Sequence, residues 1–251
     1  MGRVKGLVLC GGTGVRLRPI TYYFQKTMIP IGLKQKPLLE YVVRLLKFHG
    51  IRDISFLVNY KAEQIANYFD DGLRFNVQIS YIKDDPVVRG TGGSLLTAFW
   101  KGAINTEDTV LVYYGDILTN INLQEFLRFH ENKASWATVA LASGFTVRVG
   151  LADIDKSGKI FGFVEKPKLE KPVSIGILVF KGETLEDIEQ LMKGKHTLDL
   201  MKDAIPYLIK MGKPVYGYLS NAFWYDVGSV EAYEKLDPKL VENMMAYLFS
   251  E

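Results

Sequence analysis

Short apolar runs alternate with segments of helical periodicity through the first half of the chain. Apolar runs at 6–10, 54–59, 77–82 and 109–114 are bounded by Gly, Asp or Asn, as strands buried on both faces of a sheet usually are. The clearest helical pattern runs from Pro37 to His49, where Leu38, Val42 and Leu45 form an apolar ridge and Gly50 ends it. This alternation predicts βαβ units and a mostly parallel sheet.

The second half of the chain is less regular and predicts a mixed sheet. We expect a helix from Asn122 to about Asn132, strands at 137–141, 175–180 and 215–219, and helices at 185–192 and 198–211. A hairpin is expected from Val147 to Phe163, because the Asp-Lys-Ser-Gly sequence at 155–158 is a turn signal. The predicted fold is therefore a Rossmann-like three-layer α/β/α domain with a mixed, mostly parallel central sheet.

The end of the chain predicts one more helix, and nothing divides the chain into separate domains. Asp237 and Pro238 have the N-cap and first-position pattern, and Val241, Met244, Met245 and Leu248 share one face. That face is expected to pack on the body or on a second subunit, which leaves a homo-oligomer open. Because we find no repeat or linker, we expect a single domain over residues 1–251 with an inserted lobe at about 145–225.

Composition excludes several classes of protein. With 251 residues, of which 48% are hydrophobic, the chain is expected to fold as a globular protein. The net charge is +3 and no run of like charges marks a nucleic-acid or membrane-binding arm. The single Cys10 is expected to be buried in a reducing cytoplasm. Three scattered histidines disfavour zinc, so any metal should be held by oxygen atoms.

The loop after the first predicted strand, Gly11-Gly12-Thr13-Gly14, is the strongest candidate site. It places backbone N–H groups at the carboxyl edge of the sheet, where open α/β folds bind phosphates, although a tight turn would also use these glycines. The loop lacks the Gly-Lys-Ser/Thr ending of Walker A, and Leu17 replaces the third glycine of the dinucleotide fingerprint. Pro19 leaves no room for a long helix, so side chains such as Arg16, Arg18 and Lys26 are expected to neutralise the phosphates.

An ordered set of motifs extends through almost the whole chain. It comprises Gly12 to Thr21, Lys26-Thr27-Met28-Ile29-Pro30, Gly90-Thr91-Gly92-Gly93-Ser94, Tyr114-Gly115-Asp116, Val164-Glu165-Lys166-Pro167, Gly176-Ile177-Leu178-Val179-Phe180 and Trp224-Tyr225-Asp226-Val227-Gly228. This set resembles the signature of the sugar-1-phosphate nucleotidyltransferases, also called nucleotide-sugar pyrophosphorylases. Within this family, the glycine-rich turn at Gly90 most resembles that of the mannose-1-phosphate guanylyltransferase-like members. The fold implied is that of the nucleotide-diphospho-sugar transferases.

The resemblance implies a role for each matched residue. Arg16 and Lys26 would be catalytic, and Asp116 and Asp226 would hold Mg²⁺. Nucleotide-binding positions would be Leu9, Gly11, Gly12, Thr13, Gly14, Asp85, Gly90 and Thr91, and sugar-phosphate-binding positions would be Gly150, Glu165, Lys166, Ser174 and Gly176. Asp116 follows a buried apolar run, so its carboxylate should emerge at a strand end, and Mg²⁺ prefers one or two carboxylates with phosphate oxygens. Trp224 and Tyr225 are expected in the core.

The implied reaction joins a nucleoside triphosphate to a hexose-1-phosphate and releases pyrophosphate. The motifs favour GTP and mannose-1-phosphate, since Asp84 and Asp85 could accept the two N–H donors of guanine, although both could equally be turn residues before Pro86. A glucose-1-phosphate uridylyl- or thymidylyltransferase is the alternative. From other classes, a regulatory relative without activity is disfavoured by the retained charged residues. A glycosyltransferase is disfavoured because Gly115-Asp116-Ile117-Leu118, which follows a predicted strand, lacks the second acid of an Asp-x-Asp-like metal motif.

The chain departs from the family pattern at a few positions. Val15 stands in place of a Thr, Gln25 and Thr27 replace the prolines that flank the Lys, and Ser174 replaces a sugar-contacting Asn. Two extra residues precede Gly90. These departures affect the expected base and sugar more than the expected reaction. We expect no β-helix after the catalytic domain and therefore no second, acetyltransferase activity.

Overall fold

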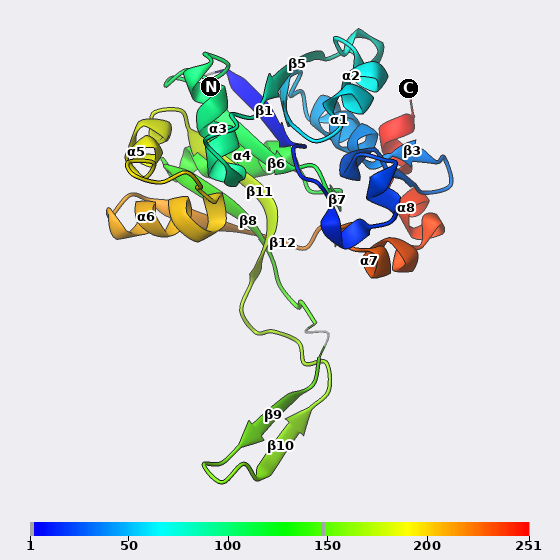
Figure 1. Ribbon diagram of the computed structural model, residues 1–251, viewed down its shortest axis with the longest axis vertical. Helices are drawn as coiled ribbons and strands as arrows, with labels where there is room; N and C mark the ends of the chain where they lie inside the picture. The colour runs from blue at the N-terminus through cyan, green and yellow to red at the C-terminus, as the bar shows by residue number, and fades with distance from the viewer. Residues whose placement is uncertain (1–2, 147–148, 251) are drawn as a thin grey trace.

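A computed structural model describes residues 3–146 and 149–250 (Figure 1). Its centre is a seven-stranded sheet in the order β12-β8-β11-β6-β1-β4-β5. The strands of this sheet are β1 (Val4–Leu9), β4 (Asp53–Val58), β5 (Gln78–Lys83), β6 (Thr109–Tyr114), β8 (Ala137–Ala142), β11 (Val173–Lys181) and β12 (Val215–Ser220). The bounds of all seven strands lie within two residues of those predicted from the sequence. The pattern of apolar runs therefore located the sheet correctly.

The sheet is mixed, as expected. Strands β6, β1, β4 and β5 run parallel to one another, and β12 is parallel to β8. Only β11 runs antiparallel, to both β6 and β8. Because the four parallel strands end at the same edge, the loops after Leu9, Val58, Lys83 and Tyr114 are brought together there.

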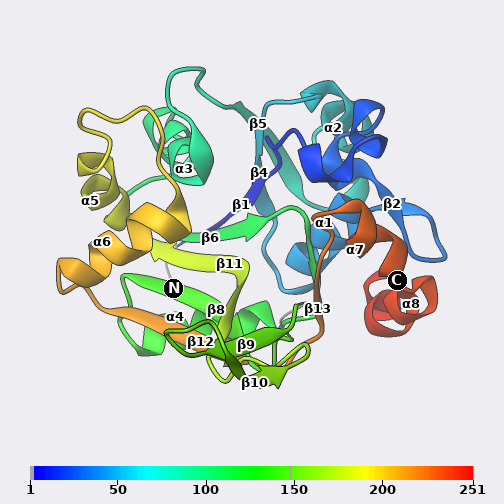
Figure 2. The same cartoon turned by 60° about the horizontal axis from the view of Figure 1, so that its bottom comes forward.

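Helices cover both faces of the sheet, which confirms the three-layer α/β/α class. One apolar core contains residues of α1 (Leu38–Phe48), α2 (Ala62–Phe69), α4 (Leu123–Asn132) and α8 (Pro238–Met245). The other contains residues of α3 (Gly90–Trp100), α5 (Thr184–Gln190) and α6 (Ile205–Lys210). Figure 2 shows α3, α5 and α6 on one side of the molecule and α1, α8 and α7 (Val230–Lys235) on the other. None of the helices in the described ranges is long and apolar enough to cross a lipid bilayer.

The segment from Gly90 to Ser94 was expected to be a glycine-rich turn, and this was wrong because it forms the first turns of α3. A Cβ on Gly92 would lie 2.8 Å from Cγ of Leu198, and one on Gly93 would lie 3.0 Å from the carbonyl oxygen of Val88. The glycines therefore allow the helix to pack closely against two neighbouring segments. Packing overrides the low helical propensity of glycine here.

Two further expectations concern helices in the second half of the chain, and the second of them is confirmed for packing on the body. The helix predicted at 198–211 is shorter, because a π-helical turn at Leu200–Ala204 precedes α6. The face of α8 formed by Val241 and Met245 is buried in the core of this chain. Asp237 caps α8 as predicted by accepting a hydrogen bond from the backbone N–H of Lys239.

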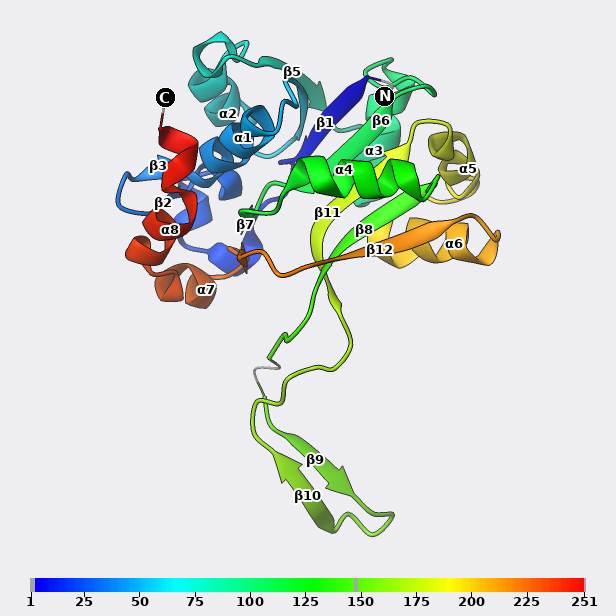
Figure 3. The same ribbon diagram turned by 180° about the vertical axis from the view of Figure 1, so that it is seen from behind.

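The predicted hairpin forms a separate arm. Strands β9 (Leu151–Ile154) and β10 (Ile160–Val164) pair with each other and not with the large sheet. Their turn is the expected one, since the N–H of Gly158 donates to the carbonyl of Asp155. The expected start at Val147 lies outside the described residues. Figures 1 and 3, which view the molecule from opposite sides, both show the arm projecting away from the body.

Four shorter strands lie outside these sheets, and sequence reasoning missed them. They are β2 (Pro30–Ile31), β3 (Lys36–Pro37), β7 (Ile117–Thr119) and β13 (Trp224–Asp226). The β7–β13 pair is the important one, because it joins segments that are far apart in the chain.

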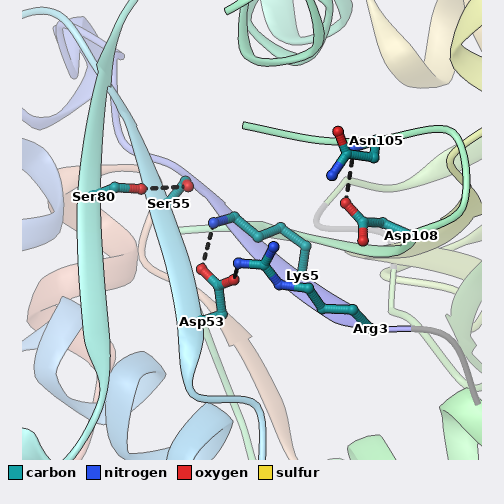
Figure 4. A network of polar contacts seen from close by, with 7 residues as sticks. All are labelled: Arg3, Lys5, Asp53, Ser55, Ser80, Asn105 and Asp108. Atoms are coloured by element: carbon teal, nitrogen blue, oxygen red, sulfur yellow. Dashed lines mark hydrogen bonds and ion pairs between the residues drawn. The ribbon is translucent and has the colours of Figure 1, made fainter. Parts of the chain in front are cut away.

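Charged residues are paired at the amino end of the sheet, opposite the loop edge. Lys5 is buried on β1, and its ammonium contacts the carboxylate of Asp53 on β4, which also contacts Arg3 (Figure 4). Ser55 and Ser80 exchange a hydroxyl hydrogen bond of 2.6 Å between β4 and β5. A buried ammonium is costly unless it is paired, so Asp53 makes Lys5 tolerable at this position.

His130 on α4 is buried and electrically neutral. Its Nδ1 lies 2.8 Å from the hydroxyl of Thr138, and no described group bonds to its Nε2. Burial lowers the pKa of His130 to about 4, and the nearby Lys181 contributes in the same direction. Protonation is therefore easier in the unfolded chain, so the folded state loses stability as the pH falls below about 6.5.

We predict that this histidine makes stability depend on pH. From pH 7 to pH 5, the wild-type chain should lose about 2 kcal/mol more free energy of unfolding than His130→Gln, as follows from the lowered pKa. Urea unfolding of both proteins at the two pH values measures the difference. A glutamine retains a polar partner for Thr138 without titrating. Equal losses in both proteins would show that folding does not lower the pKa of His130.

Candidate functional site

A cavity of about 420 Å³ lies where the parallel strands end; we call it the strand-end cavity. It brings together most of the residues predicted to bind a nucleotide, and these are Leu9, Gly11, Gly12, Thr13, Asp85, Gly90 and Thr91. Lys26 and Asp116 line it as well. Gly14 is outside the lining, one residue beyond the part of the loop that faces the cavity.

The glycines of the opening loop have different reasons to be glycine. A Cβ on Gly11 would lie 2.4 Å from Oδ2 of Asp84, so the loop contacts the end of β5 closely. Gly14 has φ 63°, and a Cβ there would lie 2.7 Å from Cγ2 of Thr21. Gly12 faces open space. Packing therefore requires Gly11 and Gly14, whereas Gly12 leaves room for a ligand to approach the backbone.

The expectation that no long helix follows the loop is confirmed. A single 3-10 turn, Val15–Leu17, takes its place. Arg18 lies over the ring of Tyr22, 5.1 Å from its centre, and lines none of the cavities described here. Of the three cationic residues proposed for phosphate neutralisation, Arg16 and Lys26 are the two that reach a cavity.

Gln25 and Thr27, two departures from the family pattern, hold Lys26 in place between them. The buried amide of Gln25 donates to the carbonyl of Cys10 and accepts from both the N–H and the hydroxyl of Thr27, at 2.6 and 2.7 Å. Lys26 then extends to the carboxylate of Asp116 and forms an ion pair with it. Burial raises the pKa of the Cys10 thiol, so this residue stays protonated and unreactive at neutral pH, as its strand-end position indicated.

Asp116 and Asp226 lie close together although they are far apart in the chain. Asp226 ends β13, which pairs antiparallel with β7 just after Asp116, and the N–H of Val227 donates to the carbonyl of Asp116 over 3.0 Å. Both aspartates line a second cavity of about 610 Å³, which we call the bridging cavity. Two carboxylates facing one open space suit Mg²⁺ once phosphate oxygens complete its ligands. Among residues 3–146 and 149–250, no cluster of three such side chains forms a closed metal site.

Arg16 lies on the other side of Asp226. It lines a third cavity, of about 350 Å³, together with Asp226 and Trp224; we call it the Arg16 cavity. Trp224 was expected in the core, but it is only half-buried, and its ring stacks on that of Phe145 at 6.1 Å between centres. The bridging cavity shares Asp116 with the strand-end cavity and Asp226 with the Arg16 cavity, so the three are contiguous.

The residues predicted to bind the sugar phosphate fall into two groups. Ser174 and Gly176 line the bridging cavity. Gly176 has φ 75°, and a Cβ there would lie 2.6 Å from the ring of Tyr114. Gly150, Glu165 and Lys166 instead lie on the arm and line none of the three cavities.

On the arm, these three residues still lie close together. A Cβ on Gly150 would be 2.8 Å from Oε2 of Glu165, so the carboxylate covers this glycine. Glu165 and Lys166 form an ion pair at 3.8 Å with side chains that are 63% and 62% exposed. The structure therefore assembles this part of the predicted site, but away from the rest.

Asp84 and Asp85 have different environments. The carboxylate of Asp85 accepts hydrogen bonds from the N–H groups of Val87 and Val88, at 2.7 and 3.3 Å, so Asp85 holds a turn. Asp84 also lines the strand-end cavity, and its buried Oδ1 has no partner among the described atoms. Burial raises the pKa of Asp84, while Ser94 and Lys101 oppose the shift. Asp84 thus has an unsatisfied carboxylate oxygen, whereas the carboxylate of Asp85 serves its own turn.

Sequence reasoning missed Asp199. This residue lines the bridging cavity, and its carboxylate accepts a hydrogen bond of 3.1 Å from Thr91 and two more from the N–H groups of Met201 and Lys202. It therefore connects the start of α3 with the π-helical turn. Its position in the predicted 198–211 helix carried no signal of a cavity.

Comparison with known proteins adds an independent finding. The family model described as nucleotidyl transferase matches residues 5–243. A UTP–glucose-1-phosphate uridylyltransferase of Synechocystis is 34% identical over 92% of this chain and 61% of its own length. A mannose-1-phosphate guanylyltransferase of Mycobacterium tuberculosis is 28% identical over 96% of this chain and 66% of its own length. The chain thus spans less than two thirds of each of these two curated relatives.

A solved structure has the same fold. The crystal structure of HddC from Yersinia pseudotuberculosis, complexed with GMP-PN, aligns with a TM-score of 0.71 and 23% identity. The alignment covers 96% of this chain and 100% of that one. The mixed sheet and its flanking helices are therefore those of a known fold.

Proposed function

We propose the following reaction for this chain, which belongs to the nucleotidyl transferase family. An oxygen of a sugar-1-phosphate attacks the α-phosphorus of a nucleoside triphosphate, forms a nucleotide-diphospho-sugar and expels pyrophosphate. The observation that carries the proposal is the set of contiguous cavities, in which Lys26 and Asp116 border one side and Arg16 and Asp226 the other. Two cations and two carboxylates at the junction suit the transfer of a phosphoryl group between two anions.

The roles of the residues follow from their positions. The triphosphate would lie against the backbone of Gly12 and Thr13 in the strand-end cavity, and the sugar phosphate would occupy the bridging cavity. Lys26 and Arg16 would neutralise charge on the transferred and leaving phosphates. The attacking oxygen is already anionic, so no general base is needed and catalysis depends on alignment and charge neutralisation. Mg²⁺, held by Asp116 and Asp226, would supply further positive charge to the phosphate oxygens.

Guanine is the base that the strand-end cavity suits best. Oδ1 of Asp84 is a buried acceptor without a partner, and guanine offers two adjacent N–H donors, whereas uracil and thymine offer one. The guanylyltransferase relative and the GMP-PN complex of HddC support this choice, while the uridylyltransferase relative supports UTP. We therefore propose GTP and a hexose-1-phosphate, with mannose-1-phosphate as the first candidate.

The first test is a substrate screen. The purified chain is incubated with Mg²⁺, each of GTP, UTP, dTTP, CTP and ATP, and either mannose- or glucose-1-phosphate, and pyrophosphate release is measured. We expect fastest release with GTP and none without a sugar-1-phosphate. Fastest turnover with UTP or dTTP would make the base assignment wrong but leave the reaction standing, and no release with any pair would contradict the reaction itself.

Neutralising either aspartate should remove activity without unfolding the protein. Asp116→Asn and Asp226→Asn should each lower kcat by about 100-fold or more, because one ligand of the cation that stabilises the phosphoryl group is lost. Far-ultraviolet circular dichroism should match that of the wild type. Glu63→Gln, an exposed carboxylate on α2 that lines none of the three cavities, is the control and should keep full activity. Full activity in either aspartate variant would disprove the metal role.

Asp84 should determine the choice of base. Asp84→Asn exchanges an acceptor oxygen for an N–H₂ group of the same size, so kcat/KM for GTP should fall about 10- to 100-fold while that for UTP changes little. Asp85→Asn provides the comparison, because its carboxylate caps a turn and its loss should affect all triphosphates alike. If Asp84→Asn lowered kcat/KM equally for all triphosphates, the role of Asp84 would be to pack against Gly11 and not to select the base.

A further inference from the structure

The arm has the surface of a protein interface. We define the arm as residues 149–166. Seven of its large apolar side chains are at least half exposed, and these are Val149, Leu151, Ile154, Ile160, Phe161, Phe163 and Val164. In β10, Phe163 pairs with Ala152 and Val164 with Leu151, so apolar groups lie on both faces of the ribbon. A two-stranded ribbon is marginally stable in water by itself, and a contiguous apolar surface of this kind marks an interaction site.

The root of the arm directs it away from its own body. Strands β8 and β11 pair antiparallel up to Ala142 and Val173. Beyond them the ribbon continues, because Thr146 bridges Lys168 and the N–H of Leu169 donates to the carbonyl of Phe145 over 2.8 Å. The arm is therefore connected to the sheet through the continuation of these two strands, and it projects away from the body (Figure 3).

The bridging cavity, in turn, lacks a group that the arm carries. Its lining includes three carboxylates, those of Asp116, Asp199 and Asp226, and no lysine or arginine among the described residues. A sugar-1-phosphate in this cavity would bring further negative charge. On the arm, Lys166 follows the last strand with an exposed ammonium, beside the equally exposed Glu165. The ammonium of Lys166 is opposite in charge to the carboxylates of the cavity, while Glu165 beside it would add an acceptor for hydroxyl groups.

We propose that the chain forms a two-fold dimer in which each arm covers the bridging cavity of the partner and supplies Glu165 and Lys166 to it. The sugar-phosphate site is then built from two copies of the chain. This inference rests on the proposed function for the role of these residues, and on the exposed apolar ribbon for the dimer itself. A second copy is favoured over other partners because reciprocal exchange covers both apolar arms and completes both cavities at once.

The dimer can be tested without any substrate. Sedimentation velocity should give the mass of two chains for the wild type and of one chain for the double variant Phe161→Asp, Phe163→Asp. Leu73→Asp, which places a charge at a similarly exposed apolar position on the body, should remain dimeric. A monomeric wild type, or an arm variant that stays dimeric, would overturn the proposal.

A mixed dimer tests whether the site is shared. Arg16→Ala impairs the body of one copy and Lys166→Ala impairs the arm of the other, and two affinity tags allow the mixed dimer to be purified. With exchanged arms, one site receives both substitutions and the other none, so about half the wild-type activity should return. A mixed dimer of Arg16→Ala and Lys26→Ala, which are both body residues, should stay inactive.

The outcomes are distinct. An inactive mixed dimer of Arg16→Ala and Lys166→Ala would show that each arm serves its own body, and would overturn the shared site. A wild type that turns over no triphosphate would contradict the proposed function instead, and sedimentation would still decide whether the arms join two copies.

Discussion

The buried amide of Gln25 is the interaction on which the site depends. It ties the segment after the opening loop to the end of β1, because its N–H₂ donates to the carbonyl of Cys10 and its oxygen accepts twice from Thr27. A buried amide that lost these partners would pay the full cost of desolvation, so the segment is held firmly. Lys26, between the two residues, has its backbone fixed as a consequence. Gln25 and Thr27 stand where the family pattern has prolines. Their hydrogen bonds to each other thus provide rigidity that two prolines would otherwise give.

Close packing at the ends of β1 and β6 completes this arrangement. A Cβ on Gly115 would lie 2.9 Å from both the carbonyl oxygen of Leu9 and Cγ2 of Thr27. Only a glycine therefore allows the chain after β6 to lie against the segment that carries Lys26. Asp116, the next residue, then meets the ammonium of Lys26. The two charges neutralise each other, which lowers the cost of holding both at a partly buried position.

The sheet, most helices and the glycine loop that borders the strand-end cavity could be predicted from the sequence, because apolar periodicity and strand-end loops are local signals. What could not be predicted depends on contacts between distant segments. The start of α3 is helical because Leu198 and Val88 pack against its glycines. The carboxylate of Asp84 has its Oδ2 against Gly11 and a buried Oδ1 without a partner, and no spacing in the sequence encodes this environment. The hairpin turn could be predicted from the sequence. The position of the arm could not, because it depends on pairing that continues beyond β8 and β11.

Two lysine–aspartate pairs next to β1 show why residue type alone does not make a site. Lys5 and Asp53 lie at the amino end of the sheet, where Arg3 adds a second cation and neighbouring strands enclose the pair. Lys26 and Asp116 lie at the carboxyl end and line a cavity of about 420 Å³. The first pair is satisfied by the protein and serves the fold. The second faces a space that a polyanion can enter, so either charge can exchange its partner for a ligand. Strand polarity, which directs the loops of all four parallel strands to one edge, therefore determines which of two similar ion pairs can take part in chemistry.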